Sequence, residues 1–334
     1  MKRLSICIPT YNFGKFIGVT LDSILPQLSE GVEVIVLDGG STDGTAIEVA
    51  SRQRNCPQLH YIQQGFRGGI DRDIETVVSL ATGKYCWLFS ADDIMLSGAI
   101  EKILKAIESD CDVYLCEHVL CNLKMDPICE YPPLMNQHGP CLFNLGEALQ
   151  RREYFRLART SEAFFSFMSS PIFKKETWDA ATVPESFRGS CWIVAGHLLS
   201  MIPKGLTVYY LAEISLHKRG ENDSFADRGI VNRFRIAIES FQHVANMVFG
   251  ERSEEAFHIR RVLQQDIPLR YLMLAKLRAT DSPASEDIHM LNRIVRMHYA
   301  DPGLGNWIKY AMYKVAHPLI LKLMHHQQRY WRKM

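Results

Sequence analysis

The stretch VEVIVLDGGSTDGT, residues 32–45, joins an apolar, β-branched run to a glycine-rich polar loop. Short runs of the same apolar kind lie at residues 4–8, 32–37, 59–63, 85–89 and 113–116. Between them, apolar residues recur at helical spacing, as at Ile70, Ile74 and Val77. This β-α-β rhythm predicts an α/β fold with a mainly parallel sheet and helices on its faces.

The pattern changes along the 334 residues. Prolines punctuate residues 120–225, which favours loops that shape a site over a second regular sheet. Helical spacing returns after residue 226. We expect one domain at 1–225, with a nucleotide-binding half at 1–110 and an acceptor half at 111–225, and a helical region at 226–334. Helices are predicted there at 240–249, 256–265, 269–277 and 288–298, with a polar break at 281–287.

Composition narrows the class of protein. Hydrophobic residues make up 47% of the chain and charged residues 22%, which is typical of a soluble globular protein. The net charge of +1 argues neither for nor against a polyanionic partner. Nucleic-acid binding is disfavoured because the only concentration of basic residues is the C-terminal tail, which lacks a recognition module. The nine cysteines are scattered without a C-x-x-C pair, which indicates a reducing compartment. Without a signal-like or membrane-spanning run, a cytoplasmic location with peripheral membrane contact is expected.

Two polar loops follow the first two predicted strands. Pro9, Thr10 and Tyr11 follow the first, and Asp38 opens the glycine-rich loop after the second. Open α/β sheets bind ligands at the carboxyl ends of their strands. Neither G-x-G-x-x-G nor a P-loop motif is present, so a nucleotide would be held differently, with Asp38 accepting a hydrogen bond from a base or ribose. The alternative is that residues 38–45 form only a turn and a helix cap.

A second glycine-rich segment, GGIDRD at residues 68–73, opens a predicted helix. Its backbone amides and Arg72 suit phosphate groups. Alternatively, its acidic residues only favour the helix N-terminus electrostatically.

The sharpest chemical signal is YCWLFSADD, residues 85–93, in which a buried-type strand runs directly into Asp92 and Asp93. Carboxylates at a strand end, beside a nucleotide loop, suit Mg²⁺ or Mn²⁺ shared with a diphosphate. Such an ion would neutralise a leaving diphosphate. The alternative is helix capping before residues 94–107.

The motifs, in order and spacing, resemble the family 2 glycosyltransferases of the GT-A fold, clearly over residues 4–110 and weakly to 225. The segments that carry the resemblance are PTYN (9–12), DGGSTDGT (38–45), GGIDRD (68–73), ATGKY (81–85) and FSADD (89–93). Two later segments, FKKETWD (173–179) and RGENDSF (219–225), are most similar to the O-antigen abequosyltransferases. Those enzymes attach a dideoxyhexose from a CDP-sugar to a lipid-linked oligosaccharide of the lipopolysaccharide O-antigen.

The resemblance implies site residues by position. Pro9, Thr10 and Tyr11 would line the nucleotide base, and Asp38 would bind the base or ribose. Asp92 would reach the metal and the diphosphate. Independently of the resemblance, Arg219 could help to bind the diphosphate, together with His217. The chain departs from the family's D-x-D pattern because Ser90 stands at its first acidic position, which leaves fewer charged ligands for the ion.

The resemblance also implies a general base about a hundred residues after the D-x-D, but GSCWIVAGH, residues 189–197, holds no carboxylate. His197 has suitable chemistry, and Asp93 and Glu185 are rivals. A catalytically inactive nucleotide-binding partner is the alternative that this gap and Ser90 leave open. A nucleotidyltransferase is disfavoured because no glycine-rich basic loop follows the first strand.

The C-terminal segment at 307–333 mixes aromatic and aliphatic residues with basic ones, and no acidic residue follows Asp301. This composition favours an interfacial helix on an anionic membrane leaflet, next to a polyprenyl-diphosphate-linked acceptor. The alternative is a helix packed on the catalytic domain with a solvated basic face.

Overall fold

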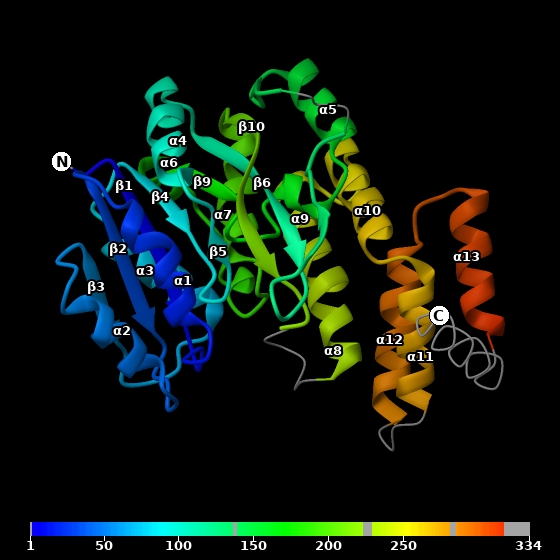
Figure 1. Ribbon diagram of the computed structural model, residues 1–334. Helices are drawn as coiled ribbons and strands as arrows, with labels where there is room; N and C mark the ends of the chain where they lie inside the picture. Colours follow the sequence, from blue (N-terminus) through cyan, green and yellow to red (C-terminus); the bar gives the residue numbers. More distant parts are fainter. Residues whose placement is uncertain (1, 136–138, 223–228, 281–284, 317–334) are drawn as a thin grey trace. The chain divides into compact units, whose positions relative to one another are not determined.

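The structure, a computed structural model, describes residues 2–135, 139–222, 229–280 and 285–316 (Figure 1). The chain forms two compact units, unit 1 at residues 1–222 and unit 2 at residues 223–334. The boundary predicted at residue 225 and the tail beyond residue 316 lie outside the described residues.

Unit 1 is built on a mixed sheet with strand order β3-β2-β1-β4-β9-β6-β10-β5, to which β7 and β8 add at β6 and β10. β1 to β4 are mutually parallel, as are β6 and β10, whereas β9 runs antiparallel between the two sets. The predicted α/β fold with a mainly parallel sheet is therefore confirmed. The strands are β1 Leu4–Thr10, β2 Val32–Asp38, β3 Leu59–Gln63, β4 Tyr85–Leu88, β5 Ile94–Met95, β6 Val113–Cys121, β7 Pro127–Glu130, β8 Cys141–Asn144, β9 Pro171–Lys174 and β10 Thr207–Arg219.

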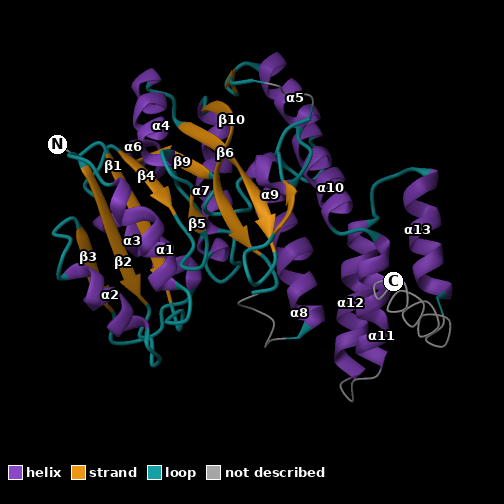
Figure 2. Cartoon of the chain, in the orientation of Figure 1, coloured by secondary structure: helices purple, strands orange, loops and turns teal. Residues whose placement is uncertain are grey.

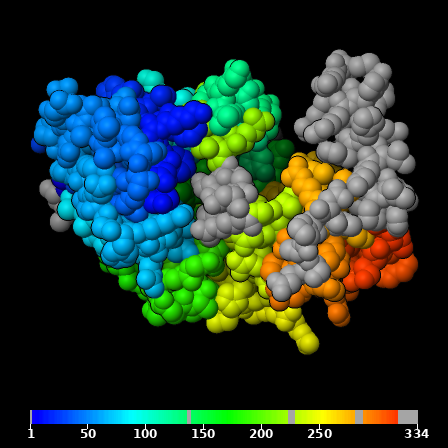
Figure 3. Space-filling model, turned by 90° about the horizontal axis from the view of Figure 1, so that it is seen from below, coloured from blue at the N-terminus to red at the C-terminus, as the bar shows by residue number. Residues whose placement is uncertain are grey.

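The apolar runs of the sequence form the centre of this sheet. Every residue of β1, β2 and β4 is buried, as expected for parallel strands that are covered on both faces. The register pairs Thr10 with Asp38, and β4 lies on the other side of β1. The carboxyl ends of these strands therefore meet at one edge, and Figure 3 looks onto the loops at that edge.

Helices flank the strands of unit 1 (Figure 2). α1 packs against α2, while α3 packs against α7, which also contacts α6. The α-helices are α1 Ile17–Ile24, α2 Thr45–Gln53, α3 Ile70–Leu80, α4 Ala99–Ala106, α5 Ala148–Leu157, α6 Lys175–Asp179 and α7 Ile193–Met201. Short 3-10 turns lie at η1 Leu25–Gln27, η2 Ile107–Ser109, η3 Ser161–Phe164, η4 Glu185–Phe187 and η5 Ile202–Lys204.

The expectation of irregular loops at residues 120–225 was wrong, because these residues supply β7 to β10 and α5 to α7. β10 is long, but its pairing with β6 shifts register between Tyr210 and Leu216, and Ala212 has a φ of 52°. The irregularity interrupts the alternation by which a strand is recognised in sequence.

Unit 2 is helical, and its predicted helices are confirmed to within a few residues. Its helices are α8 Ile230–Phe234, the π-helical η7 Arg235–Ser240, α9 Phe241–Phe249, α10 Glu254–Asp266, α11 Leu269–Thr280, α12 Ser285–His298 and α13 Leu304–Val315. Its core gathers Leu272, Leu291 and Ile294. Among the described residues, no helix has the length and apolar character that crossing a membrane requires.

Candidate active site

The loops after β1 and β2 lie side by side because Thr10 and Asp38 are register partners. Asp38 is fully buried. Its Oδ1 accepts a hydrogen bond from the Ser41 amide at 2.7 Å, and its Oδ2 accepts one from the Tyr61 hydroxyl at 2.6 Å. Tyr61 lies on β3, where an aromatic residue is ordinary packing, so sequence reasoning missed it. The carboxylate thus has one fixed orientation at the sheet edge.

Tyr11 forms the outer part of this edge. The guanidinium of Arg67 lies over its ring, 4.1 Å from the centroid. Arg72, predicted to face phosphates, is exposed on α3, and Pro9 is buried within β1. Arg67, which was not predicted, is therefore a cation that contacts the loop after β1.

The carboxyl group of Asp73 lies so close to Gly39 and Gly68 that neither position has room for a side chain. A Cβ atom at Gly39 would lie 2.9 Å from Asp73 Oδ2, and one at Gly68 would lie 2.9 Å from Oδ1. Gln64 donates a hydrogen bond to Oδ1 at 2.9 Å. The two glycine-rich segments therefore close around one buried carboxyl group. Burial raises the pKa of Asp73, although the hydrogen bond from Gln64 opposes the increase.

Asp92 is held from two directions. Ser90 Oγ donates to its Oδ1 at 2.6 Å, and Asn222 Nδ2 donates to its Oδ2 at 2.7 Å. Ser90, the departure from D-x-D, thus orients the carboxylate that follows it. The sequence indicated the segment at 219–225 that contains Asn222, but it did not indicate a role for Asn222 itself.

Asp93 points into the protein. It is 1% exposed and accepts hydrogen bonds from the Arg219 amide at 3.0 Å and from Ser169 Oγ at 2.9 Å. Burial raises the pKa of Asp93, and the neighbouring charge of Asp92 raises it further. The side chain of Arg219 donates to the main-chain carbonyl of Asp92 at 3.0 Å and lies over the ring of Phe16. Arg219 therefore fixes the loop that carries both carboxylates.

Asp71 organises the segment where the family resemblance places a base. Its Oδ2 accepts hydrogen bonds from the amides of Gly189 at 2.7 Å and Cys191 at 2.8 Å. Its Oδ1 accepts one from Ile193, the first residue of α7, at 3.2 Å. Burial raises the pKa of Asp71, while the three amides act against the increase. An α3 carboxylate thus supplies the negative charge at this helix N-terminus.

His197 lies one turn further along α7. Its ring stacks on Trp178, with centroids 3.8 Å apart, and its Nε2 is 3.3 Å from Glu75 Oε1. Glu75 also receives the guanidinium of Arg188, which pairs with Glu185. Burial lowers the pKa of His197, against the effect of Glu75. The structure therefore links His197 to Glu185 through Glu75 and Arg188, but connects neither of them to Asp92 or Asp93 by a described hydrogen bond.

Asp92 is the group in this site that suits a divalent cation. Each oxygen accepts one hydrogen bond, and a carboxylate oxygen has a lone pair left for a second partner. The described residues contain no group of three His, Cys, Asp or Glu side chains arranged to hold a metal. Because Mg²⁺ is commonly held by one or two carboxylates together with substrate phosphates, these residues fit a cation that binds jointly with a diphosphate.

Comparison with known proteins agrees with this geometry. The family model described as glycosyl transferase family 2 matches residues 5–172, which is half of the chain. The chain belongs to glycosyltransferase family 2. This family 2 glycosyltransferase is 28% identical over 296 residues to abequosyltransferase RfbV of Salmonella typhimurium, which covers 85% of this chain and 87% of that protein. The predicted family and the similarity to abequosyltransferases are confirmed.

Solved structures show the same fold. S. aureus TarS 1–349 in complex with UDP-GlcNAc matches with a TM-score of 0.59 at 15% identity, over 89% of this chain and 83% of that chain. Mannosyltransferase PcManGT from Pyrobaculum calidifontis, in complex with GDP-Man and Mn²⁺, matches with a TM-score of 0.53 at 17% identity, over 93% of this chain and 79% of that chain. The GT-A fold of this family 2 glycosyltransferase is thereby established.

Proposed function

We propose that this enzyme transfers a dideoxyhexose such as abequose from a CDP-sugar to a hydroxyl of a polyprenyl-diphosphate-linked oligosaccharide, in the synthesis of an O-antigen or related lipopolysaccharide. The name of RfbV supports the sugar, since that protein is similar to this chain over 85% of its length. The observation that carries the proposal is the fixed carboxylate of Asp92 at the same sheet edge as Asp38.

In this proposal, different residues contact the base, the ribose and the diphosphate of the donor. Tyr11 and Thr10 line the base, and the Asp38 carboxylate receives a hydrogen bond from the base or ribose. Asp92 faces the diphosphate, while Arg219 and Ser90 hold its loop and carboxylate in place. A Mg²⁺ or Mn²⁺ ion bound there would neutralise charge on the leaving diphosphate. We infer direct displacement at the anomeric carbon, with inversion.

Nucleotide binding gives the first test. CDP with Mn²⁺ or Mg²⁺ is expected to raise the melting temperature more than UDP, GDP or dTDP, because a ligand that binds only the folded state stabilises it by mass action. A ligand at 100 times its Kd stabilises by about 2.7 kcal/mol. The measurement is a thermal-shift titration, repeated with EDTA, which should reduce the shift.

The assay then proceeds to transfer of the sugar from CDP-abequose to a lipid-linked oligosaccharide. A melting shift specific to UDP, GDP or dTDP would contradict the CDP assignment. The absence of a shift with all four nucleotides would contradict the donor site itself.

We also propose peripheral contact with the cytoplasmic face of the inner membrane, through one face of α13. Five apolar side chains recur on this helix at helical spacing and are 42% to 79% exposed: Leu304, Trp307, Ile308, Met312 and Val315. Lys314 is exposed beside them, which suits an anionic leaflet. Such contact would bring the enzyme to a lipid-linked acceptor.

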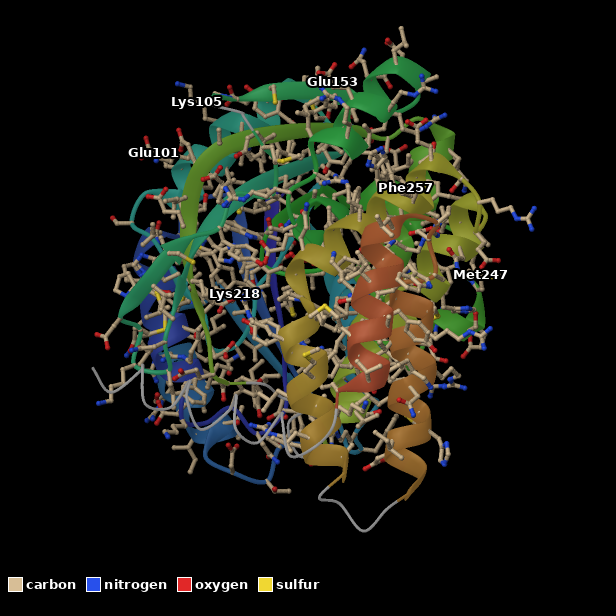
Figure 4. The ribbon with its side chains drawn as sticks, turned by 90° about the vertical axis from the view of Figure 1, so that its right-hand side faces the viewer. Glu101, Lys105, Glu153, Lys218, Met247 and Phe257 are labelled. Atoms are coloured by element: carbon tan, nitrogen blue, oxygen red, sulfur yellow. The ribbon has the colours of Figure 1, made fainter. Side chains whose placement is uncertain are left out.

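The change Trp307→Ala with Val315→Ala is expected to lower binding to phosphatidylglycerol-containing vesicles at least about 10-fold, because burial of both side chains in lipid is lost. Vesicle co-sedimentation measures it. Met247→Ala is the matched control, since Met247 is an exposed apolar residue of α9 (Figure 4). Equal binding by the double variant and the native protein would contradict this membrane face.

A further inference from the structure

A cluster of charged and aromatic side chains lies on the acceptor half of unit 1, outside the donor residues. We call it the β10 cluster: His118, Tyr131, Glu162, Phe167 and Lys218. Lys218 Nζ donates to Glu162 Oε1 at 3.0 Å and lies 4.0 Å from the centroid of the Phe167 ring. Figure 4 labels Lys218 among the side chains near the end of β10.

The β10 cluster adjoins Asp93 through two chain segments, the one that carries Lys218 and the one that carries Glu162. Lys218 immediately precedes Arg219, whose amide donates to Asp93. Glu162 lies seven residues before Ser169, whose hydroxyl donates to the other Asp93 oxygen. The charge of Lys218 also lowers the pKa of Asp93, against the effects of burial and of Asp92. The segments that fix Asp93 therefore also place Glu162 and Lys218.

Within the β10 cluster, the His118 ring is buried beside the Glu162 carboxylate. Glu162 and His118 are 4% and 1% exposed. His118 Nδ1 is 3.3 Å from Glu162 Oε2, yet neither ring nitrogen of His118 has a hydrogen-bond partner in the part of the chain that the structure describes. Burial lowers the pKa of His118 to about 2, so the ring is neutral. A buried polar group without a partner is destabilising, because no hydrogen bond offsets the loss of its contacts with water.

A purely structural ion pair would not explain this arrangement. A structural pair gains most when its remaining polar atoms are satisfied, which the His118 ring is not. The side chains of Lys218 and Tyr131 are partly exposed and contact the buried pair, because Lys218 donates to Glu162 and the ring centroid of Tyr131 lies 5.3 Å from that of His118. The β10 cluster thus combines an aromatic ring, a cation and a carboxylate, which together suit the apolar face and the hydroxyls of a sugar.

We propose that the β10 cluster binds the acceptor sugar and that Glu162 is the general base of the transfer. The inference rests on the proposed function, because it assigns the acceptor side of that same reaction. Glu162 takes the place that the sequence left open among His197, Asp93 and Glu185.

The proton and electron balance is simple. Glu162 Oε2 takes the proton of the acceptor hydroxyl as its oxygen forms the bond to the anomeric carbon. The bond from that carbon to the diphosphate oxygen breaks, and its electron pair leaves with the nucleoside diphosphate. Lys218, whose Nζ donates to Glu162 Oε1 at 3.0 Å, places its positive charge beside the carboxylate, and His118, neutral, accepts or donates a hydrogen bond at the sugar. The proton on Glu162 passes to water after product release.

The test is the variant Glu162→Gln, assayed with CDP-abequose and a lipid-linked oligosaccharide. Transfer is expected to fall by about 10² to 10⁴-fold in kcat, the usual effect of losing a general base. The Kd for CDP should stay unchanged, which also shows that the variant is folded. Glu153→Gln is the matched control, because Glu153 is an exposed glutamate of α5 (Figure 4).

A chemical rescue separates a base from a residue that only holds structure. Azide attacks without losing a proton, so Glu162→Ala with added azide should form the glycosyl azide at a rate above that of its sugar transfer. Native transfer rates in Glu162→Gln, or no azide product from a Glu162→Ala variant that binds CDP, would overturn the assignment. If Glu162→Gln fails to bind CDP, Glu162→Asp replaces it. That variant keeps a carboxylate but withdraws it by one methylene group, so a smaller loss of kcat at unchanged Kd is expected.

Failure of the proposed function has a different signature. In that case the native enzyme itself would transfer no sugar from CDP-abequose. Loss of transfer in His197→Gln with full transfer in Glu162→Gln would overturn the inference while leaving the proposed function intact.

Discussion

Asp92→Asn is expected to lower kcat/KM for sugar transfer by about 10³-fold, because the diphosphate and its cation lose their charged ligand. Metal neutralisation of a leaving group contributes several kcal/mol, and about 4 kcal/mol corresponds to that factor. The fold should persist, since asparagine has the same shape and Ser90 and Asn222 can still pair with it. Steady-state transfer kinetics across a Mn²⁺ titration measure the effect, and the variant should also need more metal.

Asp179→Asn provides the matched control for this substitution. Asp179 ends α6, its side chain is 52% exposed, and it pairs with Lys175. It should transfer sugar at the native rate. An Asp92→Asn enzyme with native kcat/KM and native metal dependence would refute the role of Asp92 and remove the observation on which the donor site rests.

Asp71→Ala is expected to destabilise unit 1 by about 3 kcal/mol, because three backbone amides lose a charged acceptor. Each hydrogen bond to a charged group contributes about 1.5–3 kcal/mol, and relaxation of the loop recovers part of the sum. Cys191, held at a φ of 69°, would lose the contact that offsets its unfavourable backbone conformation. For a unit of this size, the loss corresponds to roughly 6–12 °C in Tm by calorimetry.

The control on the same helix is Ser79→Ala. Ser79 is exposed on α3, and its hydroxyl bonds only locally, to the Thr76 carbonyl. Its Tm should stay within about 1–2 °C of the native value, as for an ordinary surface change below 0.5 kcal/mol. A Tm equal to the native value in Asp71→Ala would mean that the 189–193 loop is held by other contacts.

The parts of the fold that could be predicted are those with local signals. β1 and β2 are continuous apolar runs because both faces of each strand are covered, and the helices of unit 2 keep a regular apolar spacing. β10 could not be found in the same way. Its shifted register and its mixture of buried and half-buried residues reflect pairing with β6, about ninety residues earlier in the chain.

The candidate site divides along the same line. Asp38 and Asp92 stand directly after apolar strands, so their position carries chemical meaning in the sequence alone. Ser169 and Asn222 are ordinary polar residues that reach Asp93 and Asp92 across 76 and 130 positions of chain. Their importance comes from the folded contact. Glu162, in the turn η3, was missed for the same reason, because its partners His118 and Lys218 lie on β6 and β10.

The position of Asn222 has a practical consequence for dissecting this enzyme. It is the last residue of unit 1, and its amide group restrains the Asp92 carboxylate. A catalytic fragment cut a few residues earlier would retain the complete sheet up to Arg219 and still lose one of the two side-chain hydrogen bonds that orient that carboxylate. An excised unit 1 should therefore be ended after Asn222, since the last residue before the junction belongs functionally to the donor site.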